Sequence, residues 1–157
     1  MHPQKYIAHT RKQDGEEQPL LAHLQAVAKR ASEHTKSLGE EFARVCGLTH
    51  DIEKYSAAFQ AHIRGDTRRV DHATGGGQLL YDKSKLGILC AYCVMGHHGG
   101  LPNGGAYGQD TGDNKTLYGR LKRRVEPYDA YRHEVTIPPM VSLTQEWRDG
   151  FASFCFV

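Results

Sequence analysis

The stretch from Glu40 to Tyr55 reads EEFARVCGLTHDIEKY, and it decides the expected fold. Its apolar residues recur three or four positions apart, the spacing of a helix with one buried face. The stretch therefore predicts a helix from about Glu40 to His50 and beyond. Neighbouring helical residues point about 100° apart, so His50 and Asp51 can both reach a point at one helix edge. Lys54 lies one turn further along on the same side.

Helical patterns flank this stretch on both sides. Upstream, Pro19 suits a first helical position, and the apolar spacing continues to Ala31 before Gly39, a plausible stop. Downstream, Ser56 is expected to cap a short helix that Gly65 closes. Further helices are expected over about 72–81 behind Asp71, over 84–98 behind Ser84, over 116–126, and from Ser142 to Phe154.

The pattern contains no convincing strand, internal repeat or linker. Residues 99–112 are rich in glycine and predict a loop directly after a histidine pair. The predicted fold class is all-α, with a single domain over residues 1–157. The apolar run at 151–157 has no helix stop signal, which predicts that the domain is truncated at its C-terminus.

Composition narrows the class of protein. A chain of 157 residues can bury a sufficient core without disulfides. No apolar run approaches the roughly 20 residues needed to span a bilayer, and the N-terminus lacks the apolar segment of a secretory signal. We therefore expect a cytoplasmic protein with no membrane partner.

The cysteines and the basic residues each allow two interpretations. Cys90 and Cys93 form a CxxC spacing before two histidines, which would suit zinc, but their apolar surroundings favour ordinary buried cysteines. A basic run with no acidic residue is equally typical of a phosphate-binding surface and of a solvated helix face. It comprises Lys115, Arg120, Lys122, Arg123 and Arg124.

Histidine is the unusual component, with ten residues spread along the chain. Five imidazoles and a carboxylate fall on four separate predicted helices: His23, His50, Asp51, His72, His97 and His98. Imidazole and carboxylate together suit divalent transition metals, and carboxylate also holds magnesium. The glycines after His98 leave room for the side chains to converge and for a substrate to approach. The sequence thus predicts a metal site.

At this point the chain resembles a known family, the HD nuclease domain of the CRISPR-associated nuclease-helicase of type I systems. The resemblance covers nearly the whole chain and keeps the order of five motifs: LAHL at 21–24, HDIEKY at 50–55, FQAHIRG at 59–65, VDHATGG at 70–76 and GHHGGLP at 96–102. The opening AHTR at 8–11 and DG at 14–15 is similar to the type I-C branch. The last two motifs are much more specific than the HD pair, which many phosphohydrolases share.

The resemblance implies an HD-type helical bundle with two divalent ions. One ion would be held by His23, His50 and Asp51. Asp51 would bridge to a second ion held by His72, His97 and His98, with Lys54 beside the scissile phosphate. The ions are left open among manganese, nickel, cobalt, iron, zinc and magnesium. The implied partners are single-stranded DNA, a helicase domain and a guide-RNA surveillance complex.

Two departures from the family pattern concern the site. Glu53 stands where the family usually has glycine, and its carboxylate could alter the choice of ion. The family's further metal-ligand aspartate on a late helix lies beyond the end of this chain, Asp149 is not in that motif, and the helicase portion is absent. We therefore expect a first metal site that is incomplete.

The leading expectation is an enzyme, a metal-dependent nuclease that cuts single-stranded DNA. The alternatives are an HD phosphohydrolase acting on a nucleotide and a metal-binding fragment without turnover. Tyr55 and Phe59 are expected in the core, and Asp71 is expected to cap a helix or to orient His72. The remaining histidines are expected at the surface, except His9, whose role is left open: His2, His34, His62 and His133.

Overall fold

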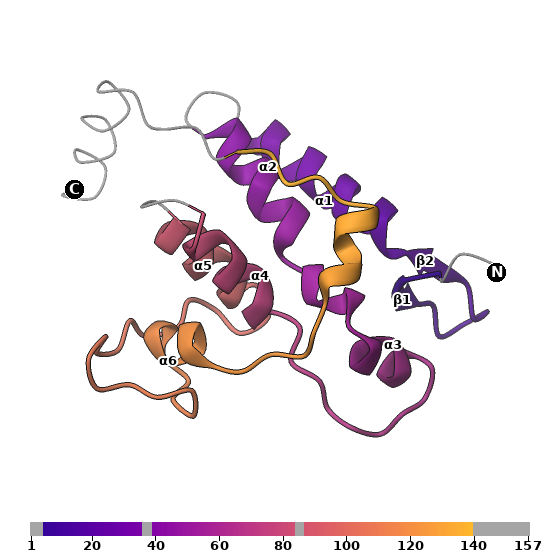
Figure 1. The fold of residues 1–157 in the computed structure, drawn as a ribbon. Helices are drawn as coiled ribbons and strands as arrows, with labels where there is room; N and C mark the ends of the chain where they lie inside the picture. Colours follow the sequence, from indigo (N-terminus) through magenta and orange to yellow (C-terminus); the bar gives the residue numbers. More distant parts are fainter. Residues whose placement is uncertain (1–4, 36–38, 84–86, 140–157) are drawn as a thin grey trace.

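The computed structural model describes residues 5–35, 39–83 and 87–139, and it is mostly helical (Figure 1). Its elements in chain order are β1 Ile7–Thr10, β2 Glu17–Pro19, α1 Leu20–His34, α2 Glu40–Thr49, η1 Ile52–Tyr55, α3 Ala57–Ile63, α4 Thr74–Tyr81, α5 Gly87–Gly96, α6 Leu117–Lys122 and η2 Asp129–His133, where η marks a 3-10 helix. The predicted helical class is confirmed. No described helix combines the length and apolar composition that a membrane crossing would require.

The expectation of no strand was wrong, because the chain opens with a short antiparallel hairpin. β1 pairs with β2, and His9 lies opposite Gln18. The hairpin is anchored by a side chain distant in sequence: the amide of Gln60 accepts from the Ile7 N–H at 3.1 Å and donates to the Ile7 carbonyl at 2.9 Å. Ile7 and Ala8 are buried while His9 is exposed, so the strand does not alternate cleanly between faces.

The first helical layer is the pair α1 and α2, which lie side by side in Figure 1. Gly47 allows them to approach closely, since a Cβ there would come within 2.5 Å of the Ala28 Cα. The buried faces of α1 and η1 meet in one core cluster that includes Leu20, Leu24 and Ile52. This packing places His23, which lies between Leu20 and Leu24 in α1, beside the end of α2.

The second layer is the pair α4 and α5, which packs across α2. Leu80 of α4 and Val94 of α5 share a core cluster with Val45 of α2. Gly76 is required at the crossing, because a Cβ there would lie 2.1 Å from the Thr49 carbonyl oxygen. The start of α4 and the end of α5 are thereby held next to the end of α2.

The predicted helix boundaries are mostly right. The Ser56 hydroxyl caps α3 by accepting from the Phe59 N–H at 3.2 Å. α4 begins at Thr74, so His72 precedes the helix instead of starting it. α6 ends at Lys122, four residues before the predicted end, because Arg123 is extended. Three predictions concern residues outside those that the structure describes: the Ser84 cap, the helix over 142–154 and the surface position of His2. Cys155 also lies outside the described residues.

Candidate metal centre

The structure brings all six predicted ligands and Lys54 to one place. Each ligand comes from the end of a helix or from a segment beside one. His23 projects from α1, His50 and Asp51 follow α2, His72 precedes α4, and His97 and His98 follow α5. Lys54 lies in η1, within 2.9 Å of the Asp51 carboxylate.

Asp51 is the centre of this cluster and is 2% exposed. Its Oδ2 lies 3.0 Å from His23 Nε2, 3.2 Å from His50 Nε2 and 2.9 Å from Lys54 Nζ. Its Oδ1 faces His97 Nε2 at 3.4 Å and His72 Nε2 at 3.7 Å. Oδ1 is the one buried side-chain oxygen or nitrogen among the described residues that has no hydrogen-bond partner. A buried carboxylate oxygen of this kind costs free energy unless a cation satisfies it.

The histidine tautomers also favour a bound cation at this cluster. His50 Nδ1 lies 2.8 Å from the Gly47 carbonyl, and His97 Nδ1 lies 2.6 Å from the Val94 carbonyl. A carbonyl oxygen only accepts, so in both rings Nδ1 carries the proton and donates. In the neutral ring Nε2 then bears a lone pair, and it is this atom that faces Asp51. This is the arrangement in which a carbonyl fixes the ring of a metal-ligating histidine.

His72 and His98 form a second close pair, with their Nε2 atoms 2.6 Å apart. Burial lowers the pKa of His72 to about 4, despite the opposing effect of Asp51. Burial and the neighbouring His97 lower the pKa of His98 as well. Both rings are therefore neutral at pH 7, and a metal ligand must be neutral imidazole.

Asp51 stays ionised in these surroundings. Burial alone would raise its pKa, but the close imidazoles of His23, His50 and His97 outweigh burial and hold the pKa far below its ordinary value. Burial would lower the pKa of His97, and the nearby Asp51 carboxylate raises it instead. A buried anion surrounded by lone-pair donors is a suitable set for a divalent cation.

Two groups of ligand atoms share Asp51. In the first, the ligand atoms of Asp51, His72, His97 and His98 all lie within 4.8 Å of one another. In the second, those of His9, His23 and Asp51 do so. The described residues thus contain a buried cluster that could hold a metal ion, and the donor chemistry fits one.

His9 is the member that sequence reasoning left open. It is carried by β1, and its ring centroid lies 4.8 Å from that of His23. Burial and the nearby Lys54 lower its pKa, which keeps the ring neutral. A signal was present in the sequence, because His9 belongs to the AHTR segment, but only the hairpin brings that segment to the cluster.

Lys54 is adjacent to Asp51 as predicted, and its side chain is 2% exposed. Its ammonium group also donates to the Ala8 carbonyl at 3.2 Å and lies 5.2 Å from the centre of the Phe59 ring. Lys54 therefore compensates the Asp51 charge inside the protein. Tyr55 and Phe59 are buried, as predicted.

Glu53 does not join the ligands. Its carboxylate accepts from the Gly75 N–H at 2.6 Å, and the side chain is 1% exposed. Burial raises its pKa to about 7. Glu53 thus holds the start of α4, three residues after His72.

Asp71 and the basic run are largely engaged within the protein. Asp71 accepts from the Ala73 N–H at 3.0 Å and from the Thr74 hydroxyl at 2.7 Å, which fixes the turn before α4. Arg120 donates to the Thr74 hydroxyl at 2.9 Å, and Arg123 donates to the Gly112 carbonyl at 2.9 Å. Lys122 donates to the Asp110 carbonyl at 2.8 Å. Lys122 and Arg123 therefore hold the loop that follows α5, and Arg120 is held by α4.

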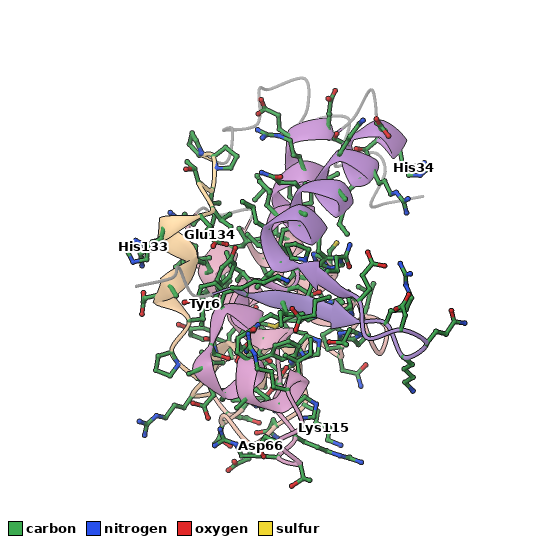
Figure 2. The ribbon with its side chains drawn as sticks, turned by 90° about the vertical axis from the view of Figure 1, so that its right-hand side faces the viewer. Tyr6, His34, Asp66, Lys115, His133 and Glu134 are labelled. Atoms are coloured by element: carbon green, nitrogen blue, oxygen red, sulfur yellow. The ribbon has the colours of Figure 1, made fainter. Side chains whose placement is uncertain are left out.

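The remaining residues with two predicted roles mostly take the structural or surface role. Cys90 is buried in a core cluster with Cys46 packed against it, as predicted, whereas the prediction was wrong for Cys93, which is exposed. None of the described cysteines belongs to a metal-holding group. His62 is exposed, and Figure 2 shows His34 and His133 at the periphery of the molecule, as predicted. The side chain of Lys115 also lies at the periphery.

Comparison with known proteins adds no assignment. No protein-family model matches the chain, and no curated protein matches its sequence significantly.

Proposed function

We propose that this chain is an HD-type, metal-dependent phosphodiester hydrolase that acts on single-stranded DNA. The observation that carries the proposal is the buried Asp51 carboxylate, whose unsatisfied Oδ1 faces the imidazole nitrogens of His72, before α4, and His97, after α5. The order of motifs along the chain, from LAHL to GHHGGLP, supports the same class.

Two ions fit the two ligand groups. His72, His97 and His98 would hold one together with Asp51, and His9 and His23 would hold the other, with Asp51 shared. His50 Nε2 lies 3.2 Å from both His23 Nε2 and Asp51 Oδ2, so it belongs beside the second group. A pair of divalent ions lowers the pKa of a bound water and stabilises the attacking and leaving oxygens of a phosphodiester.

The protein's own groups orient these ligands. The Gly47 and Val94 carbonyls fix the rings of His50 and His97 by accepting from Nδ1. Lys54 holds Asp51 in place and balances its charge while the carboxylate is buried. Beside the scissile phosphate, its ammonium group would also stabilise the negative charge that develops there.

The substrate and partners follow from the resemblance. Single-stranded DNA would reach the cluster on its exposed side, where His97, His98 and the glycines after them lie at the surface. A helicase domain would supply the strand, and a guide-RNA surveillance complex would recruit both. The choice among manganese, nickel, cobalt, iron, zinc and magnesium depends on competition between ions.

The test is degradation of a labelled single-stranded DNA, with each metal ion added separately and a chelator as control. Asp51→Ala should abolish cutting and reduce the bound metal, measured by mass spectrometry after dialysis. Asp113→Ala, an exposed carboxylate, is the matched control. Loss of phosphate from a mononucleotide with intact DNA would indicate a nucleotide phosphohydrolase. Stoichiometric metal with no hydrolysis of either substrate would indicate a metal-binding fragment.

A further inference from the structure

A small pocket of about 140 Å³ opens beside the metal cluster and is lined by arginine. Two segments distant in sequence form its walls, and each contributes a consecutive arginine pair. The pairs are Arg68 with Arg69, before α4, and Arg123 with Arg124, after α6. Three carboxylates complete the charged lining: Glu53, Asp71 and Glu126.

In each pair one arginine forms an ion pair with a carboxylate of the described residues, and the other does not. Arg68 lies 3.7 Å from Glu126, and Arg123 lies 3.3 Å from Asp71. Arg69 and Arg124 have no ion pair or side-chain hydrogen bond with any residue that the structure describes, and both are exposed. The third carboxylate, Glu53, already accepts from the Gly75 N–H. The pocket therefore presents two exposed guanidinium groups, Arg69 and Arg124, that pair with no side chain of the described residues.

The pocket adjoins the metal cluster through the chain itself. Asp71 in its wall immediately precedes His72, and Glu53 lies between Asp51 and Lys54. The pocket and the cluster thus share two stretches of chain, residues 51–54 and 71–72.

We propose that Arg69 and Arg124 bind a backbone phosphate of the nucleic-acid substrate, away from the phosphate that is cut. This inference rests on the proposed function and names the second contact of the same substrate. Arginine suits the task because its planar fork donates two parallel hydrogen bonds to phosphate oxygens. Pockets for whole small molecules measure about 300–1,000 Å³, so this one accommodates a phosphate group and not a complete nucleotide.

The experiment measures binding without cutting. A labelled oligothymidylate is titrated with the full chain in a chelator, by fluorescence anisotropy at several salt concentrations. The variant Arg69→Gln/Arg124→Gln is compared with Arg30→Gln/Lys83→Gln, which removes two exposed charges elsewhere. Circular dichroism melting verifies that each variant is folded. Arg69→Lys/Arg124→Lys keeps the charges but removes the forks.

The pocket variant should raise the Kd about tenfold, with a slope of log K against log salt that is smaller by about 0.7, the contribution of one phosphate contact on a single strand. The lysine variant should keep the salt slope, and the control pair should match the parent. An unchanged Kd and slope in the pocket variant would overturn the inference. So would equal affinity of the parent for thymidine monophosphate and for the oligomer. Failure of the proposed function looks different: the DNA binds, but no metal supports cutting.

Discussion

Replacing Glu53 by glutamine should change how the stability of the protein depends on pH. Glu53 is 1% exposed, and burial raises its pKa from the ordinary 4.5 to about 7. In the folded protein the carboxyl group therefore keeps its proton to a higher pH than in the unfolded chain. Between pH 4.5 and 7 the unfolded chain holds fewer protons, so folding stability falls as the pH rises.

The magnitude follows from the size of the shift. One pKa unit corresponds to about 1.4 kcal/mol, so the raised pKa of Glu53 lowers the free energy of unfolding by about 3 kcal/mol. This loss is complete above pH 7. Most of this loss falls between pH 5 and 8. Glutamine has nearly the same shape, and its amide oxygen can accept from the Gly75 N–H as the carboxylate does. Glu53→Gln should therefore remove this loss.

The assay is urea unfolding of the metal-free protein in a chelator at pH 5 and pH 8. Other groups titrate in this range. The pKa of His72, lowered to about 4, makes stability rise with pH between about 4 and 6.5. The informative quantity is thus the difference between the variant and the parent. Glu33→Gln, which changes an exposed carboxylate of α1, is the control. If parent and Glu53→Gln differ by the same amount at both pH values, the burial argument is refuted.

Three further predictions concern packing, capping and metal content. Gly76→Ala should lower the free energy of unfolding by about 3 kcal/mol, because the added Cβ would meet a backbone carbonyl. The control Gly99→Ala, which has open space around it, should leave the free energy of unfolding unchanged, and urea unfolding measures both. Ser56→Ala should cost about 1 kcal/mol in the same assay by removing the cap of α3. His9→Ala should reduce bound manganese from two ions to one per chain by mass spectrometry, and His62→Ala should retain both; two ions in His9→Ala would exclude it as a ligand.

The helices and the residues that cluster around Asp51 could be predicted from the sequence because their signals are local. Apolar spacing located α1, α2 and α5, and the histidines stand at or just beyond the ends of those helices. Convergence followed because helices that bury one face against each other bring their ends together. The cap at Ser56 is likewise a property of a few consecutive residues.

The features that could not be predicted depend on contacts between distant residues. β1 and β2 span four and three residues, and their anchor is Gln60, 53 positions after Ile7. These strands have no alternation of apolar and polar residues that would predict a hairpin, so the approach of His9 to the cluster was not expected. The basic run was ambiguous for the same reason, since the carbonyl partners of Arg120 and Lys122 belong to other segments.

The direction of the helices gives a physical reason why the cluster is suited to cations. His50 and Asp51 directly follow the C-terminus of α2, and His97 and His98 directly follow that of α5. The partial negative charge of a helix lies at its C-terminus and favours cations there by roughly 0.3–1 kcal/mol for a unit charge. Both helix ends thus add to the Asp51 carboxylate in attracting a divalent ion. Phosphate is repelled by the same ends until ions are bound. A separate, arginine-lined pocket therefore lets the strand bind independently of the metals, which is why the binding test in chelator can separate the two sites.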